Sequence, residues 1–364
     1  MSPPVFHWFL PTSGDGQDVG DQSQTGLSSS SARPASIDYL GQIARAADQL
    51  GYSGVLTPVG TWCEDAWIIT AALARETRDL RFLVAMRPGI VSPTLTAQMA
   101  ATFQRVTGGR VALNVVAGGN DAEQRRFGDR CNHDERYART DEFLSVVRGA
   151  WSAEDFDFDG DYYQVEGARV LTPPEPLPEV YFGGASAPAE EVAARHADVY
   201  LAWGEPPEMV AERVARMRLL AERHERRLRF GIRLHVITRD TAEEAWAETD
   251  RMLGQMDDAA VKLAQRRLKK MDSVGQQRML ALHGGRKDNL LVAPNLWAGI
   301  GLLRGGGGTA LVGSHAEVAE RIHEYHEIGF DEFILSGYPH LEEAYRVAEG
   351  VLPLFSNVAE LAAA

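Results

Sequence analysis

The stretch Leu228-Arg-Phe-Gly-Ile-Arg-Leu-His-Val-Ile-Thr238 decides the fold, because as a strand it has two unlike faces. Side chains alternate along a strand, so one face is wholly apolar from Leu228 to Val236. The opposite face carries Arg233 and His235, which suits the late part of an α/β barrel strand whose inner face opens at the mouth. A buried arginine needs an anionic partner or dense hydrogen bonding. The alternatives are a structural ion pair with an acid on a neighbouring strand and an anion site, and we favour the anion site.

Composition narrows the class of protein. The 364 residues contain a large apolar fraction and no polar linker, so we expect one elaborated domain over 1–364, although two domains are also compatible. A formal charge of -14 argues against nucleic acid or an anionic membrane as a general partner. The two cysteines, Cys63 and Cys131, have neither disulfide-scaffold nor zinc spacing. No signal peptide pattern or membrane-spanning run occurs, which predicts a cytoplasmic soluble protein.

The rest of the chain alternates short apolar runs with longer segments of helical spacing, the pattern of a parallel sheet with crossover helices. Eight strand-helix pairs exceed the roughly six of an open doubly wound sheet, so we predict a (β/α)8 TIM barrel. The expected strands are 5–10, 54–59, 80–86, 110–116, 180–183, 199–203, 228–238 and 332–336. The expected helices are 37–50, 63–76, 93–106, 135–151, 187–196, 207–224, 241–256, 315–328 and 341–354.

Four stretches exceed a minimal barrel. Residues 21–33 form a serine-rich loop that we interpret as mobile, and 118–134 form a polar excursion after the fourth strand. An insertion at 156–172 begins with alternating residues around Asp159-Gly160, typical of a β-hairpin. The longest, 257–313, follows the seventh strand and so lies at the end where barrel active sites form, which predicts an active-site lid.

The ends of the fourth and fifth strands offer groups suited to a phosphate-bearing ligand. Asn114 ends the fourth strand on its inner face, although a hydrogen-bonded core amide has the same pattern. In Tyr181-Phe-Gly-Gly184 the paired glycines let the backbone approach a ligand, and Ser186 begins the next helix, where free amides bind phosphate. An ordinary turn and helix cap would look alike.

The other strand ends offer reactive side chains without a metal or nucleophile pattern. Cys63 is expected at a helix N-terminus, which favours a thiolate or an acceptor, and we interpret it as lining a pocket rather than attacking. Tyr338 and His340 follow the last strand and lie at the mouth. Neither a His-x-His pair in the first strand nor a Gly-x-Ser-x-Gly or Walker motif is present. The site therefore predicts a cofactor enzyme without metal.

Taken together, the motifs carry a resemblance. The chain resembles the flavin-dependent alkanesulfonate monooxygenases of the bacterial luciferase-like family over nearly its whole length. The residues that carry it are Trp8-Phe-Leu-Pro-Thr12, Cys63-Glu-Asp-Ala-Trp67, Glu135-Arg-Tyr137, Tyr181-Phe-Gly-Gly184, Trp203-Gly-Glu-Pro-Pro207, Phe230-Gly-Ile-Arg-Leu-His-Val236, Asp272-Ser-Val-Gly-Gln-Gln-Arg-Met279, Pro294-Asn-Leu-Trp-Ala-Gly299, Gly308-Thr-Ala-Leu-Val-Gly313 and Ser336-Gly-Tyr-Pro-His-Leu-Glu-Glu-Ala-Tyr-Arg346.

The resemblance assigns residues by position. It implies an active site of two cations, an imidazole, a phenol and a pocket cysteine, at Arg233, Arg304, His235, Tyr338 and Cys63. It implies that the flavin and its phosphate are held by Asn114, Tyr137, Gly184 and Ser186. The family also presents an acidic residue after the first strand, for which Asp21 is the candidate here. The longer serine-rich loop and the different 118–134 excursion are departures that could reshape the pocket.

The resemblance also implies an activity. Reduced FMN (FMNH2) and O2 would desulfonate an alkanesulfonate to an aldehyde and sulfite, in a homodimer or homotetramer. Because the chain shows no NAD-binding fingerprint, a separate NAD(P)H-dependent FMN reductase is expected as partner. The alternatives are a related monooxygenase acting on methanesulfonate or a sulfone, a deazaflavin-dependent dehydrogenase on the same barrel, and a non-catalytic flavin-binding protein.

Overall fold

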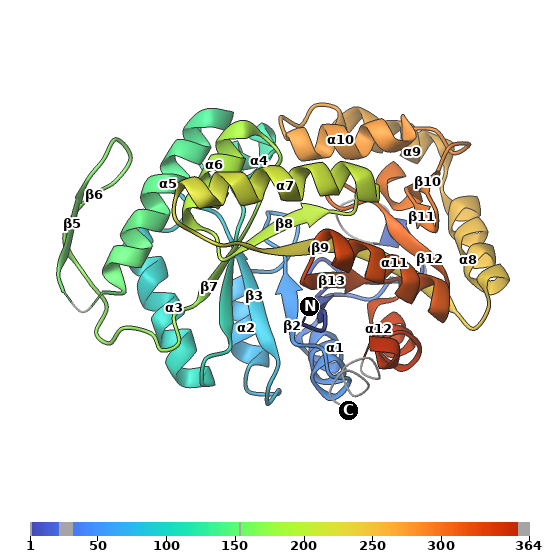
Figure 1. Ribbon diagram of the computed structural model, residues 1–364, viewed down its shortest axis with the longest axis horizontal. Coiled ribbons are helices and arrows are strands. Elements are labelled where there is room, and N and C mark those ends of the chain that lie inside the picture. The colour runs from blue at the N-terminus through green and yellow to red at the C-terminus, as the bar shows by residue number, and fades with distance from the viewer. Residues whose placement is uncertain (1, 22–31, 153, 356–364) are drawn as a thin grey trace.

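The computed structural model describes residues 2–21, 32–152 and 154–355, and its centre is a closed barrel of parallel strands with helices between them (Figure 1). The barrel prediction is confirmed, and all eight expected strands form. In barrel order they are β1 (Val5–Phe9), β2 (Gly54–Thr57), β3 (Arg81–Met86), β4 (Val111–Val115), β7 (Glu179–Gly183), β8 (Val199–Trp203), β9 (Arg229–Arg239) and β13 (Glu332–Ser336), which pairs with β1.

The expected helices also form, and polar caps fix where several of them begin. Ser92 and Thr241, for example, accept a hydrogen bond from the third backbone N–H of their helices. The helices are α1 (Ile37–Gln49), α2 (Ala66–Leu73), α3 (Pro93–Thr107), α5 (His133–Ala150), α6 (Ala187–His196), α7 (Pro207–Arg223), α8 (Ala242–Gln255), α11 (His315–Ile328) and α12 (His340–Gly350).

Strand β9 has the two faces expected of it. Phe230, Ile232 and Leu234 are buried in the apolar layer between barrel and helices. The barrel interior has its own apolar cluster, which includes Phe9 and Ile334. Burial of these two layers, worth roughly 25 cal/mol per Å² of apolar surface, drives closure of the barrel. Arg233 and His235 are thereby forced onto the inner face, at the carboxyl end of the strands.

The 257–313 segment is more ordered than a loop. It contains α9 (Asp258–Leu268), α10 (Val274–His283) and the 3-10 helix η3 (Gly299–Leu302). Its three short strands are β10 (Leu291–Ala293), β11 (Leu296–Trp297) and β12 (Ala310–Ser314). Strand β12 pairs in parallel with the second half of β9, beyond the point where β9 leaves β8. The long strand β9 therefore ties this segment to the barrel.

The other insertions are smaller. Residues 118–134 contain the short helix α4 (Asp121–Arg126), and the expected hairpin forms from β5 (Phe156–Asp159) and β6 (Gln164–Ala168) beside α5 (Figure 1). After β1 the chain reaches a short 3-10 helix, η1 (Val19–Asp21). The predicted mobile serine-rich loop lies, for residues 22–31, outside the described residues. In the described part of the chain, no helix is long and apolar enough to cross a membrane.

Candidate functional site

A cavity of about 780 Å³ opens at the carboxyl ends of the barrel strands. Phe9, Asn114 and Arg233 reach it from three different strands, and Leu268 and Arg304 reach it from the 257–313 segment. This is the end of the barrel where active sites form, and the volume falls in the range of cofactor and substrate pockets. A second cavity, between the 118–134 stretch and α5, contains none of the predicted site residues.

The cavity brings together most of the predicted site. Its walls include six of the nine predicted residues, Asn114, Tyr137, Gly184, Ser186, Arg233 and Arg304. His235 and Tyr338 lie directly behind the two arginines, within hydrogen-bond reach of them or of a shared neighbour. These residues are spread between positions 114 and 338 of the sequence. They lie close together because the carboxyl ends of the barrel strands all lie at the same end of the barrel.

Arg233 is held in the barrel wall by neutral groups. Its Nη2 donates to Ser336 Oγ at 2.8 Å, and its Nη1 donates to the carbonyl of Leu234 at 2.7 Å. No carboxylate in the described part of the chain pairs with it. Burial, with the nearby charge of Arg304, lowers the pKa of Arg233 to about 9. The guanidinium is therefore a buried cation whose counter-charge has to come from a ligand.

Arg304 delivers the second cation from the 257–313 segment. Its Nη1 donates to Tyr338 Oη at 2.8 Å and lies 3.4 Å from His235 Nε2, while its Nε has no hydrogen-bond partner among the described residues. The side chain is only 6% exposed. Arg304 is therefore not a solvated surface arginine.

One aromatic ring lies beneath both cations. The Cζ atoms of Arg233 and Arg304 lie 4.7 and 5.1 Å from the centroid of the Phe9 ring, within cation–π range. His235 stacks on Tyr338 at a centroid distance of 5.4 Å, and its Nδ1 lies 2.7 Å from Ser336 Oγ. Burial and the two arginines hold the pKa of His235 well below its ordinary value, so the imidazole is neutral. His235 therefore holds no proton to donate as an imidazolium.

The part of the cavity wall that follows β7 fits a phosphate-bearing cofactor. Ser186 is the N-cap of α6, yet its hydroxyl caps nothing, and Oγ is buried without a partner in the described part of the chain. The N–H groups in the first turn of α6 have no partner within the helix, so they can bind an anion, as at other helix N-termini. A Cβ built on Gly184 would lie 2.4 Å from that of Ala189 and 3.3 Å from the Tyr137 hydroxyl, so glycine is needed for this close approach. These residues fit the phosphate of a flavin.

Comparison with known proteins gives the same outline. The family model for luciferase-like monooxygenases matches residues 5–332. The chain belongs to the luciferase-like monooxygenase family. The match begins at the first residue of β1 and ends at the first residue of β13, so it includes almost the whole barrel.

Solved structures agree with this family at the level of the fold. The chain is similar to a riboflavin lyase solved with modified FMN and riboflavin, with a TM-score of 0.83 and 18% identity over 98% of this chain and 92% of that one. The corresponding values for the EDTA monooxygenase of Chelativorans sp. BNC1 are 0.76, 18%, 98% and 95%. An F420-dependent secondary alcohol dehydrogenase has values of 0.69, 16%, 96% and 98%. The family fold is therefore found with more than one cofactor and chemistry.

Cys63 does not lie where the sequence placed it. The helix after β2 begins at Ala66, with Asp65 as its N-cap, so the prediction that Cys63 opens the helix is wrong. Its Sγ faces the carbonyls of Pro58 and Gly60, at 3.7 and 3.6 Å. Burial raises the pKa of the Cys63 thiol to about 11, so a thiolate at neutral pH is also ruled out. Its neighbours Thr61 and Trp62 are the residues that line the cavity.

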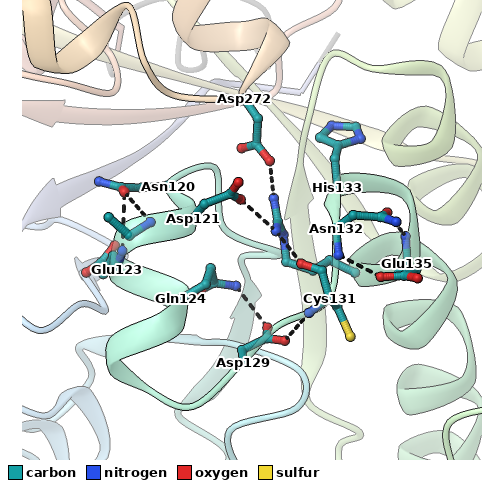
Figure 2. Close-up of polar contacts among 12 residues, drawn as sticks. Asn120, Asp121, Glu123, Gln124, Asp129, Cys131, Asn132, His133, Glu135 and Asp272 are labelled. Carbon is teal, nitrogen blue, oxygen red and sulfur yellow. Dashed lines mark hydrogen bonds and ion pairs between the residues drawn. The ribbon is translucent and has the colours of Figure 1, made fainter.

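The 118–134 stretch reaches the cavity rim and is joined there to the 257–313 segment. Arg136, whose side chain is 1% exposed, bonds Asp272 through Nη2 and Asp121 through Nη1, the latter at 3.2 Å. In Figure 2, the dashed lines from Asp272 and from Asp121 meet at one side chain between them. Where the two segments touch, a Cβ on Gly119 would meet that of Ser273 at 2.6 Å. A single buried cation therefore links two insertions across the rim.

Sequence reasoning did not single out two buried residues of this region, Phe9 and Asp15. Phe9 has no polar group to draw notice, although alternation along β1 puts it on the inner face. The candidate acid Asp21 closes η1, and its side chain lies outside what the structure describes. Asp15, also after β1, is buried and accepts hydrogen bonds from His340. No short motif announces this contact, because the two residues are 325 positions apart.

Proposed function

We propose that the chain is a two-component, FMNH2-dependent monooxygenase that desulfonates alkanesulfonates to an aldehyde and sulfite. The observation that carries the proposal is the pair of buried guanidiniums, Arg233 and Arg304, in one cavity wall with no carboxylate from the described chain between them. A sulfonate has three equivalent anionic oxygens, and arginine binds such groups through paired donors. A neutral sulfone would leave both charges uncompensated, so this alternative is weaker.

The flavin is proposed to lie with its phosphate at Ser186, Tyr137 and Gly184, after β7, two strands along the barrel from Arg233. When bound in reduced form, it supplies the electrons with which O2 is activated. The chain's own contribution is to place the sulfonate at Arg233 and Arg304, on the Phe9 ring, and to keep water from the cavity through the 257–313 segment. Reduced flavin would come from a separate NAD(P)H-dependent reductase.

Two further residues orient the cations. Ser336 Oγ lies between Arg233 and His235, Tyr338 accepts from Arg304, and Arg304 contacts His235, so the five side chains form one connected network. A preorganised network of this kind costs little to rearrange when the anion arrives. His235 completes this network as a neutral imidazole, with Ser336 at its Nδ1 and Arg304 at its Nε2.

The decisive experiment is sulfite release from a panel of sulfonates in the presence of a flavin reductase, NADH and O2. We expect sulfite to appear only when reductase, O2 and the chain are all present. Methanesulfonate, octanesulfonate and dimethyl sulfone in the panel separate short sulfonates, long sulfonates and sulfones. Tight binding of FMN with no sulfite from any sulfonate would contradict the proposal.

A second candidate is a deazaflavin-dependent dehydrogenase, which the similarity to the F420-dependent alcohol dehydrogenase favours. Hydride transfer to F420 needs no O2. Anaerobic reduction of F420 by an alcohol, measured by loss of its absorbance, would select this function over the first.

A further inference from the structure

A second polar group lies one layer behind the arginines, and the proposed function makes no use of it. Asp15 and His340 are both 0% exposed, and His340 Nδ1 lies 2.8 Å from Asp15 Oδ1. The other carboxylate oxygen accepts from the backbone N–H of His340 at 2.8 Å and from Tyr39 Oη at 2.6 Å. The carboxylate is thus fixed on several sides, and it fixes the imidazole in turn.

The hydrogen bonds determine which nitrogen of His340 is free. Although burial alone would raise it, the contacts with His340, Tyr39 and Gly16 lower the pKa of Asp15 overall, so the carboxylate is ionised and only accepts. His340 must then carry its proton on Nδ1. The lone pair on Nε2 is buried and has no hydrogen-bond partner in the described part of the chain. Such an unsatisfied buried acceptor calls for an explanation.

Burial and the charges around His340 explain why its Nε2 carries no proton in the free protein. Burial first, then the charges of Arg304 and Arg233, lower the pKa of His340 in spite of Asp15. The ring stands edge-on to Tyr338, at a centroid distance of 5.2 Å, and 5.7 Å from Phe9, so one aromatic layer separates it from the anion site. The remaining titratable or charged groups nearby are Tyr39 on α1, His235 on β9, Tyr338 itself, and Glu342 and Glu343 on its own helix.

We infer that His340 takes up a proton on Nε2 when an anion binds between Arg233 and Arg304, and that Asp15 holds the ring in the orientation that allows this. The inference rests on the anion site of the proposed function. An anion offsets the part of this shift that the two arginines cause, while the attraction of Asp15 remains to oppose the cost of burial. By linkage, protonation of His340 must strengthen anion binding by the same factor.

His340 is a better acceptor for this proton than the other groups near the anion. Both ring nitrogens of His235 already have partners, Ser336 at Nδ1 and Arg304 at Nε2. Arg233 is already charged at neutral pH. His340 is therefore a positioning residue that stores a proton one layer behind the substrate, without touching it.

The test measures proton uptake directly, by calorimetric titration of octanesulfonate into the wild-type protein, with and without FMN. Titrations in two buffers of different ionisation enthalpy, between about pH 6.5 and 8.5, give the protons taken up per anion bound. We expect uptake approaching one proton and an affinity that falls as pH rises, by up to about tenfold per pH unit. His340→Gln should abolish the uptake and flatten the pH dependence, and Asp15→Asn should reduce both.

His196→Gln is the matched control. It breaks another imidazole–carboxylate pair, between His196 Nε2 and Asp141 at 2.8 Å, on helices away from the anion site, and should leave the uptake unchanged. Octanesulfonate binding without proton uptake in the wild type would overturn the inference and leave the proposed function standing, as would full uptake in His340→Gln. Failure of the wild type to bind octanesulfonate in either state would overturn the anion site itself. The wild-type measurement decides even if a variant does not fold.

Discussion

Two arginines on the same face of β9 have opposite surroundings. At the amino end of the barrel, Arg229 Nη1 lies 2.7 Å from Glu332, and Arg229 also bonds Glu179. Glu332 in turn accepts from Tyr181 at 2.7 Å. At the carboxyl end, four residues further along, Arg233 has only carbonyl and hydroxyl partners.

This difference indicates that Arg229 contributes to the stability of the fold, whereas Arg233 contributes to the proposed function. Charges at the amino end are compensated by the protein, whereas those at the carboxyl end are left for a ligand, which is the division expected of this fold. If the comparison is right, perturbing the first end changes mainly the free energy of unfolding, and perturbing the second changes mainly binding and turnover.

The largest effect is expected from replacing Arg233 by lysine. Arg233→Lys keeps the charge but loses the planar pair of donors, so kcat/KM for sulfonate should fall by about 100- to 1000-fold. Sulfite release with excess reductase measures it. Arg229→Lys, the matched change on the same face, should stay within about threefold of wild type. Equal losses in the two variants would show that the ends do not differ in function.

The next prediction compares the free energy of unfolding after a substitution at each end of the barrel. Glu332→Gln leaves the buried partners of a 1% exposed carboxylate incompletely paired and should cost about 2 kcal/mol of unfolding free energy. Arg233→Met removes an uncompensated buried cation and should be neutral or stabilising. Urea unfolding followed by circular dichroism gives both values. A large destabilisation by Arg233→Met would mean that Arg233 serves the fold after all.

The sequence predicted the barrel and most of the cavity because both follow from local patterns. Alternation in 228–238 put Arg233 and His235 on the inner face, and strand order then placed their ends beside those of the other strands. Resemblance added Tyr137 and Arg304, which lie on elements that no periodicity would connect with the barrel mouth.

The remaining features depend on contacts between distant residues. The pairing of Asp15 with His340 and of Arg136 with Asp272 could not be read from spacing, since neither pair shares an element. Cys63 was misplaced because the cap at Asp65 moves the start of α2 by three residues, which leaves the thiol in a half-buried turn before the helix. The order within 257–313 comes from the pairing of β12 with β9.

The pH dependence of kcat/KM should report the titration of Arg233 at the carboxyl end of the barrel. Burial and Arg304 lower the pKa of Arg233 to about 9, so the charge proposed to bind sulfonate is present below that pH and is lost as the pH rises through it. Since kcat/KM reports groups of the free enzyme, it should fall by up to tenfold per unit above about pH 9. Circular dichroism at each pH checks that the fold persists. A profile that is flat to pH 10 would contradict the assignment.

A smaller effect is expected at the rim. Asp272→Asn removes a charge that Arg136 uses to join the 257–313 segment to the 118–134 stretch, and should speed limited proteolysis of 257–313 by about three- to tenfold. Asp288→Asn is the matched control, since its partner Arg286 is 71% exposed and the pair joins nothing across the rim. If both variants are cut at the wild-type rate, the Arg136 contact does not restrain the segment.

The smallest effects are expected at two serines that begin helices. Like Arg229 and Arg233, one has a structural partner and the other faces the cavity. Ser92 already uses its hydroxyl to cap α3, accepting from Leu95 N–H at 3.3 Å, whereas the Ser186 hydroxyl caps nothing and is buried without a partner among the described residues. Ser92→Ala should therefore cost about 1 kcal/mol of unfolding free energy and leave FMN affinity unchanged. Ser186→Ala should leave stability nearly unchanged, because this hydroxyl does not cap α6, and should weaken FMN binding by about three- to tenfold, the value of one hydrogen bond to a phosphate oxygen. Fluorescence titration of FMN and urea unfolding of both variants give the four numbers. Loss of stability without loss of FMN affinity in Ser186→Ala would place this serine with the structural caps and move the flavin phosphate elsewhere in the cavity.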